Sequence, residues 1–395
     1  MKYHYGEFDG QDFPTPDSLF PSPKVMQFIL QYGQQGLDAM DESDDEQYQQ
    51  MIEARIEAGL LERDEQTGEL RLTPRMVTGL EHRALLEIFE GMQRGNREGH
   101  PTHAAGRSDE RTDGTKRYTF GDPLSELDVG TTMRNAFARQ HAEQGDTDRP
   151  VRLPLGIKAG DFELHVTEGQ ADTALCVLID MSGSMMRWGR FYQAKRVALG
   201  LAAMVRTKFP QDTVDYVGFY SNATRLMEKD VPLVMPKPVT VHDYQVRLRV
   251  PLEQADDAQR VPQHFTNLHA GLRMARQILS RRGAANKLIF VITDGQPTAH
   301  IEANPAGGEM LYLIYPPCEQ TTTVTLKEAL RYQQQGIRIA TFALIDDYWG
   351  MDWVGFVNQF TRLTRGVAYY CTSEDLSSTV IESYLSGKKK KTYLG

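Results

Sequence analysis

Cysteine is scarce in this chain of 395 residues, which contains only Cys176, Cys318 and Cys371. The three are far apart and none forms a Cys-x-x-Cys pair, so neither a disulfide framework nor a zinc site is predicted. Two of them lie in apolar stretches typical of buried strands. We therefore expect the cysteines to be small residues of the core.

Long apolar runs and an excess of basic residues are also lacking. No stretch of about 18 apolar residues occurs, and the first residues, MKYHYGEFDGQDF, lack the basic and apolar regions of a secretory signal. We therefore expect no membrane span and a cytoplasmic location. The formal net charge of −9 disfavours nucleic acid as a partner of the whole molecule.

Changes in composition along the chain predict five parts. Residues 1–92 are expected to form a mostly helical region, 93–116 a flexible linker, 117–170 a connector that packs on the next domain, 171–387 an α/β domain, and 388–395 a basic tail. The first part contains a helix, hairpin and helix pattern like that of a winged helix. Its acidic surroundings favour a packing unit over a DNA-binding one.

Strands and amphipathic helices alternate in the α/β domain. Apolar strands are predicted at residues 174–179, 214–220, 288–292, 337–344 and 367–371, and helices at 191–209, 267–282, 326–335 and 352–365. This alternation is typical of βαβ units, which build a parallel sheet with helices on both faces. The predicted fold class is therefore α/β, with a Rossmann-like, doubly wound, mainly parallel sheet.

Two longer segments interrupt the alternation. Residues 231–262 alternate apolar and polar positions and predict a hairpin-like excursion, while residues 296–323 are rich in proline. Loops at such places commonly carry recognition, but they can equally just cover the sheet.

The stretch ALCVLIDMSGSM, residues 174–185, joins a fully apolar strand to three oxygen-bearing side chains, Asp180, Ser182 and Ser184. A strand that is apolar on both faces belongs in the middle of a parallel sheet, and open α/β sheets bind ligands at the carboxyl ends of their strands. Ligands that offer only oxygen suit a hard cation such as Mg2+. Because Asp, Ser and Gly also form ordinary turns, this pattern alone is weak.

Two later positions extend the pattern. Thr266 lies just before a predicted helix, and Asp294 follows the strand at 288–292 in a Thr-Asp-Gly turn. The order of Asp-x-Ser-x-Ser, a threonine before a helix, and a strand ending in Asp-Gly resembles the von Willebrand factor type A (vWA) domain. It resembles in particular that domain's metal ion-dependent adhesion site (MIDAS), with the vWA domain at 171–387. The stretch FGDPLSELDVGTTMRNAF and the overall layout are similar to bacterial intracellular vWA partners of MoxR-type AAA+ ATPases.

The resemblance implies a bound Mg2+, with Mn2+ or Ca2+ as alternatives. Ser182 and Ser184 would bind the ion directly, Asp180 and Asp294 through water, and Thr266 directly in one state and through water in another. An Asp or Glu carboxylate from a protein partner would complete the coordination. The implied function is a non-enzymatic interaction module, an adaptor or co-chaperone-like partner that couples a MoxR-type ATPase to a client protein.

Three alternatives remain open at this stage. A hydrolase of the haloacid dehalogenase type also has an Asp at the end of its first strand, but it needs a second Asp where this chain has Ser182. The five positions could also be turn residues that hold no ion. Finally, Arg187, Trp188 and Arg190 could contact an acidic partner or could simply pack at the start of a helix.

Overall fold

The computed structural model describes most of the chain as two compact units, one made of residues 1–100 and 172–395 and the other of 101–171. The described residues are 21–95, 115–118, 127–144, 156–165, 172–253, 257–305, 307–345 and 354–389. Most of the expected linker at 93–116 and most of the basic tail at 388–395 lie outside them. None of the described helices is long and apolar enough to cross a membrane.

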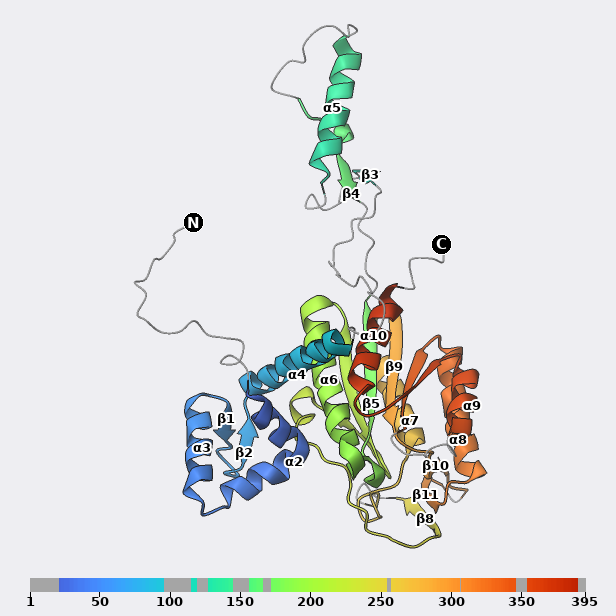
Figure 1. Cartoon of the computed structure of the whole chain (residues 1–395). Helices are drawn as coiled ribbons and strands as arrows, with labels where there is room; N and C mark the ends of the chain where they lie inside the picture. Colours follow the sequence, from blue (N-terminus) through green and yellow to red (C-terminus); the bar gives the residue numbers. More distant parts are fainter. Residues whose placement is uncertain are drawn as a thin grey trace. The chain divides into compact units, whose positions relative to one another are not determined.

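The larger unit is built on a six-stranded sheet with the order β13-β12-β9-β5-β6-β7 (Figure 1). Its strands are β5 (Thr173–Asp180), β6 (Thr213–Phe219), β7 (Ala223–Leu226), β9 (Asn286–Thr293), β12 (Arg338–Leu344) and β13 (Val367–Cys371). Five strands are parallel, and only the edge strand β7 runs antiparallel to its neighbour β6. The predicted α/β class and mainly parallel sheet are therefore confirmed, whereas β7 was not predicted.

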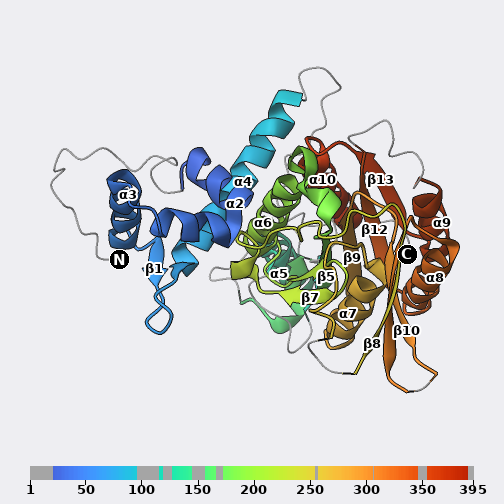
Figure 2. The same ribbon diagram turned by 90° about the horizontal axis from the view of Figure 1, so that it is seen from below.

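Helices cover both faces of this sheet (Figure 1, Figure 2). They are α6 (Arg190–Lys208), α7 (Leu268–Ser280), α8 (Glu319–Gln334), α9 (Val354–Thr364) and α10 (Leu376–Lys389). Alternate residues of β5 enter two different cores, because successive side chains of a strand point to opposite faces. Leu175, Val177 and Ile179 pack with α6 and α10, while Cys176 and Leu178 pack with α7, α8 and α9.

The two insertions form one additional sheet. Its antiparallel strands are β8 (Val246–Leu252), β10 (Ala299–Ala303) and β11 (Glu309–Tyr315), in the order β10-β11-β8. The hairpin-like excursion expected at 231–262 is wrong, because β8 from the first insertion pairs with β11 from the second. The alternating pattern indicated a strand correctly but could not identify the partner strand.

The N-terminal region packs against α6. It comprises α2 (Pro23–Asp41), α3 (Glu46–Glu57), β1 (Leu61–Arg63), β2 (Leu70–Leu72) and α4 (Pro74–Gly95), with β1 and β2 forming an antiparallel hairpin. α4 approaches α6 so closely that a Cβ added to Gly200 would lie 2.5 Å from Cδ1 of Ile88. Beside this contact, the Nη1 of Arg206 lies 2.6 Å from the buried carboxylate of Glu81.

A second contact joins this region to the segment after η4 (Glu228–Asp230). The amide of Gln34 donates a hydrogen bond to the oxygen of Leu233 (3.2 Å). The preceding residue, Gly33, interrupts α2 with φ 59° and ψ −146°. A Cβ on Gly33 would lie 2.3 Å from the Leu233 oxygen, so this approach requires glycine.

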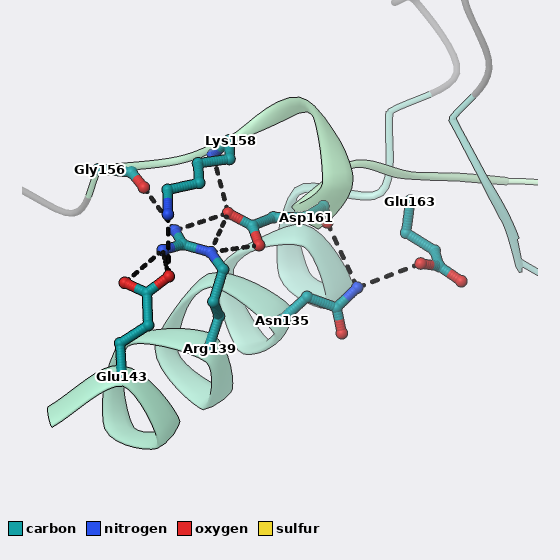
Figure 3. Close-up of polar contacts among 7 residues, drawn as sticks. All are labelled: Asn135, Arg139, Glu143, Gly156, Lys158, Asp161 and Glu163. Carbon is teal, nitrogen blue, oxygen red and sulfur yellow. Dashed lines mark hydrogen bonds and ion pairs between the residues drawn. The ribbon is translucent and has the colours of Figure 1, made fainter. Parts of the chain in front are cut away.

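The smaller unit contains α5 (Val129–Gln144), η2 (Ala159–Asp161) and the antiparallel pair β3 (Thr115–Arg117) and β4 (Glu163–His165). Arg139 lies at the centre of its polar contacts (Figure 3). The Nε of Arg139 donates to Asp161 (2.8 Å), and its Nη1 donates to Glu143 (3.2 Å). Because of the hydrogen bond from Arg139, the pKa of Asp161 falls to about 2. The guanidinium thus ties α5 to the turn that precedes β4.

Candidate metal centre

The carboxyl ends of β5 and β9 lie side by side, because the two strands are parallel neighbours with Ile179 opposite Ile292. Asp180 ends β5, and Thr293 ends β9 immediately before Asp294. The hydroxyl of Thr293 donates to Oδ2 of Asp180 at 2.6 Å, within fully buried surroundings. Two residues 113 positions apart in the sequence are thereby joined at one sheet edge.

A tight turn after β5 brings the two serines into the same chain of hydrogen bonds. The amide of Ser182 donates to Oδ1 of Asp180 (2.8 Å), and the hydroxyl oxygens of Ser182 and Ser184 lie 3.1 Å apart. The hydroxyl of Ser184 donates to Oδ1 of Asp294 (2.8 Å). Four of the five residues singled out in the sequence are therefore brought together.

Thr266 lies in the loop that precedes α7, and this loop contacts both the turn that carries the two serines and the segment that follows Asp294. Its amide donates to the hydroxyl of Thr298 (2.9 Å), and the oxygen of the nearby His264 accepts from the amide of Gly183 (3.1 Å). No hydrogen bond found in the described part of the chain joins the Thr266 hydroxyl to the other four residues. The following residue, Asn267, is the N-cap of α7 and accepts from the amide of Ala270.

Burial makes the two carboxylates of the site costly to charge. Desolvation, and next the negative charge of Asp294, raise the pKa of Asp180 to about 7. Desolvation also raises the pKa of Asp294, against the opposing effect of the nearby Arg190. A cation between such groups would favour their ionised forms.

Arg190 is a member of the site that sequence reasoning did not place there. It is the first residue of α6, and its Nη1 lies 2.6 Å from Oδ2 of Asp294. Its side chain is only 7% exposed, which excludes it as an open contact for a partner and favours the second interpretation, packing at the helix start. Only its closeness to the serine motif hinted at this role, since 104 positions separate Arg190 from Asp294.

The available ligands at this edge are hydroxyl and carboxylate oxygens. Within the described ranges, no group of three or more His, Cys, Asp or Glu side chains could hold a metal ion. Such a group is typical of sites for zinc and other thiophilic metals, whereas two buried carboxylates with neighbouring hydroxyls suit a hard divalent cation. The residues present fit Mg2+.

Comparison with known families agrees with the fold. A family model described as "Rv0959-like protein, vWA domain" matches residues 173–385, which is more than half of the chain. The chain belongs to the Rv0959-like vWA family. A second model, described as the third domain of Rv0959-like proteins, matches residues 110–167 of this Rv0959-like protein.

Its curated relatives include the uncharacterized proteins Rv0959 of Mycobacterium tuberculosis and Mb0984 of Mycobacterium bovis. Each is 28% identical over 338 residues, covering 85% of this chain and 45% of the relative. The Rv0959-like chain thus spans less than half the length of these relatives.

Solved structures similar to this Rv0959-like protein include the PilB minor pilin from Streptococcus sanguinis, with a TM-score of 0.41 and 14% identity over 61% of this chain and 67% of that one. The vWF domain of the pili tip protein Mfa5 from Porphyromonas gingivalis has a TM-score of 0.34 and 13% identity, covering 55% of this chain and 96% of that domain.

A vWA domain indicates a protein-interaction module. Neither matched family is described as a hydrolase, so the haloacid dehalogenase alternative gains no support.

Proposed function

We propose that this Rv0959-like protein is a non-enzymatic, metal-dependent protein-binding module. Its MIDAS would consist of Asp180, Ser182, Ser184, Thr266 and Asp294, holding Mg2+ or, as alternatives, Mn2+ or Ca2+. The observation that carries the proposal is the hydrogen-bonded chain from Asp180 through the two serines to Asp294. It gathers oxygen ligands from two strands at the edge where α/β sheets bind ligands.

The residues have separate tasks in this proposal. The neutral hydroxyls of Ser182 and Ser184 bind the cation without cancelling its charge, and the buried carboxylates of Asp180 and Asp294 hold its hydration shell. When bound, the cation supplies an electrophilic anchor for an anionic ligand. The chemistry of the site therefore selects an Asp or Glu carboxylate from a protein partner.

The wider role is proposed from sequence similarity. We infer that the protein acts in the cytoplasm as an adaptor or co-chaperone-like partner that couples a MoxR-type AAA+ ATPase to a client protein. The stretch FGDPLSELDVGTTMRNAF supports this assignment, and its second half forms the start of α5. A gene for such an ATPase beside this one would add independent support.

Affinity purification from cells of the source organism tests the proposal. The tagged protein should retain specific partners in Mg2+ and lose them in a chelator. Asp180→Ala and Ser182→Ala should also lose them while keeping the helical content measured by circular dichroism, whereas Ser280→Ala, an exposed serine at the end of α7, should bind normally. Undiminished binding by the first two variants contradicts the proposal.

A generic phosphatase assay in Mg2+ addresses the hydrolase alternative. We expect no turnover above that of the Asp180→Ala variant. Robust turnover that depends on Asp180 would overturn the non-enzymatic assignment.

A further inference from the structure

Both carboxylate oxygens of Asp294 accept hydrogen bonds from side chains that follow β5 closely in the sequence. Oδ1 accepts from the hydroxyl of Ser184 (2.8 Å), and Oδ2 is 2.6 Å from the Nη1 of Arg190. The Asp294 side chain has no exposed surface, and that of Arg190 is 7% exposed. An ion pair this deeply buried is costly to desolvate, so it needs a reason beyond stability.

The local backbone does not favour an arginine at this position. Arg190 begins α6, and a cation at the positive end of a helix is electrostatically unfavourable. The two preceding residues, Trp188 (φ 50°) and Gly189 (φ 68°), both adopt left-handed conformations, which is strained for tryptophan. Strain of this kind is commonly retained where a site requires it.

Trp188 also helps to hold the arginine in place. The guanidinium carbon of Arg190 lies 4.6 Å from the centroid of the Trp188 ring, a cation–π distance. Trp188 itself is 55% exposed. Ring and carboxylate together fix the positive charge next to the ligands of the cation.

Arg190 changes the net charge of the site with a cation bound. Asp180 and Asp294 together carry two negative charges when ionised, which a divalent cation alone would cancel. Arg190 adds one positive charge, so the loaded site keeps one net positive charge. A single carboxylate neutralises it.

We propose that Arg190 is a positioning residue that sets the charge of the metal centre. It lowers the affinity of the site for the cation and raises the affinity of the loaded site for an anionic ligand. This inference rests on the proposed metal-dependent function and assigns a regulating role to a residue outside the five-residue MIDAS. It also makes Arg190 the counter-charge of Asp294 before any cation binds.

The test is a calorimetric titration of the full chain with Mn2+ and Mg2+. Arg190→Gln should bind either cation about tenfold more tightly, because a repulsive unit charge has been removed at short range. Arg190→Lys should stay close to the wild type. Arg187→Gln is the matched control, since it removes the same charge from an exposed position three residues away and should leave cation affinity unchanged.

The second measurement is the affinity of the loaded site for an anion. With Mn2+ bound, acetate should displace metal-bound water and lower the proton relaxation enhancement, and half-maximal loss should need severalfold more acetate for Arg190→Gln than for the wild type. Unchanged or weaker cation binding by a folded Arg190→Gln, or equal acetate sensitivity, would overturn the inference. If the wild type itself binds neither Mn2+ nor Mg2+, the proposed function fails together with it.

Thermal melting keeps the test decisive if Arg190→Gln is unstable. Without its arginine the buried Asp294 lacks its counter-charge, so this variant should melt lower than the wild type in chelator and gain more from added Mg2+. If the variant stays unfolded in both conditions, Trp188→Ala replaces it in the titration. Trp188→Ala loosens the guanidinium and should tighten cation binding by a smaller factor, and no tightening would count against the inference.

Discussion

The ammonium group of Lys195 donates a hydrogen bond to the main-chain oxygen of Pro232 (2.9 Å) from a completely buried position on α6. A second hydrogen bond goes to the oxygen of Val234 (3.0 Å). Further along the same segment, the amide of Lys237 donates to the oxygen of Met181 in the serine turn (2.9 Å). Lys195 thus fixes a segment that contacts α2 through Leu233 and the candidate metal centre through Lys237.

This burial predicts an unusual pH dependence of stability. Desolvation lowers the pKa of Lys195 to about 7, against about 10.4 in the unfolded chain. Between these values the unfolded state binds more protons, so the contribution of Lys195 to stability rises with pH from about 7 to about 10.

We expect Lys195→Met to be less stable than the wild type, with a deficit that grows by up to about 1.4 kcal/mol per pH unit over this range. Urea unfolding at several pH values measures it. Lys208→Met, at an exposed position of the same helix, should parallel the wild type. A deficit for Lys195→Met that is independent of pH would contradict the prediction.

The contact between α4 and α6 should respond to pH in the opposite direction. Burial, and next the neighbouring carboxyl group of Glu228, raise the pKa of Glu81 to about 7, and one of its carboxylate oxygens has no hydrogen-bond partner among the described residues. The contribution of Glu81 to the free energy of unfolding is therefore largest below the pKa of this carboxyl in the unfolded chain. It is lost as the pH rises through the folded pKa of about 7.

Glu81→Gln cannot lose a proton, so its stability relative to the wild type should rise between pH 5 and pH 7.5. Chemical denaturation at both values measures the change, with the exposed Glu57→Gln of α3 as the control. A constant difference between Glu81→Gln and the wild type would show that burial does not perturb Glu81.

Gly33 should be intolerant of any side chain. Gly33→Ala combines a backbone conformation that suits only glycine with a Cβ 2.3 Å from the Leu233 oxygen, and should cost about 3 kcal/mol. Gly59→Ala is the matched control, because Gly59 also has a positive φ (65°) but open space around a Cβ. It should cost about 1 kcal/mol, and an equal loss for both variants would rule out the contact with Leu233.

The stability of the smaller unit should depend on the ion pair between Arg139 and Asp161. Because the folded pKa of Asp161 is lowered to about 2, its stabilising effect is present above the unfolded value and is lost as the pH falls toward 2. Asp161→Asn should therefore speed amide hydrogen exchange in α5 at neutral pH and leave β5 unchanged. Glu143→Gln, which alters a more exposed contact of Arg139, should have a smaller effect.

The sequence predicted the features that depend on neighbouring residues or on the rules of parallel sheets. The apolar strands were recognisable individually, and adjacent parallel strands had to bring Asp180 and Asp294 to one edge. β7, with only the four residues ATRL, was too short and too polar at its centre to stand out. Arg190 was missed because its partner is fixed by packing between distant segments, which no local pattern encodes.

The sheet β10-β11-β8 has a consequence for how this family can vary. The strand β8 precedes Thr266 in the chain, and β10 and β11 follow Asp294, yet β8 and β11 share seven paired positions. Deleting the first insertion would leave β11 without its neighbour β8, and deleting the second would leave β8 without a partner strand. We therefore expect members of this family to have gained or lost the two insertions together during evolution, because the strands of one pair with those of the other.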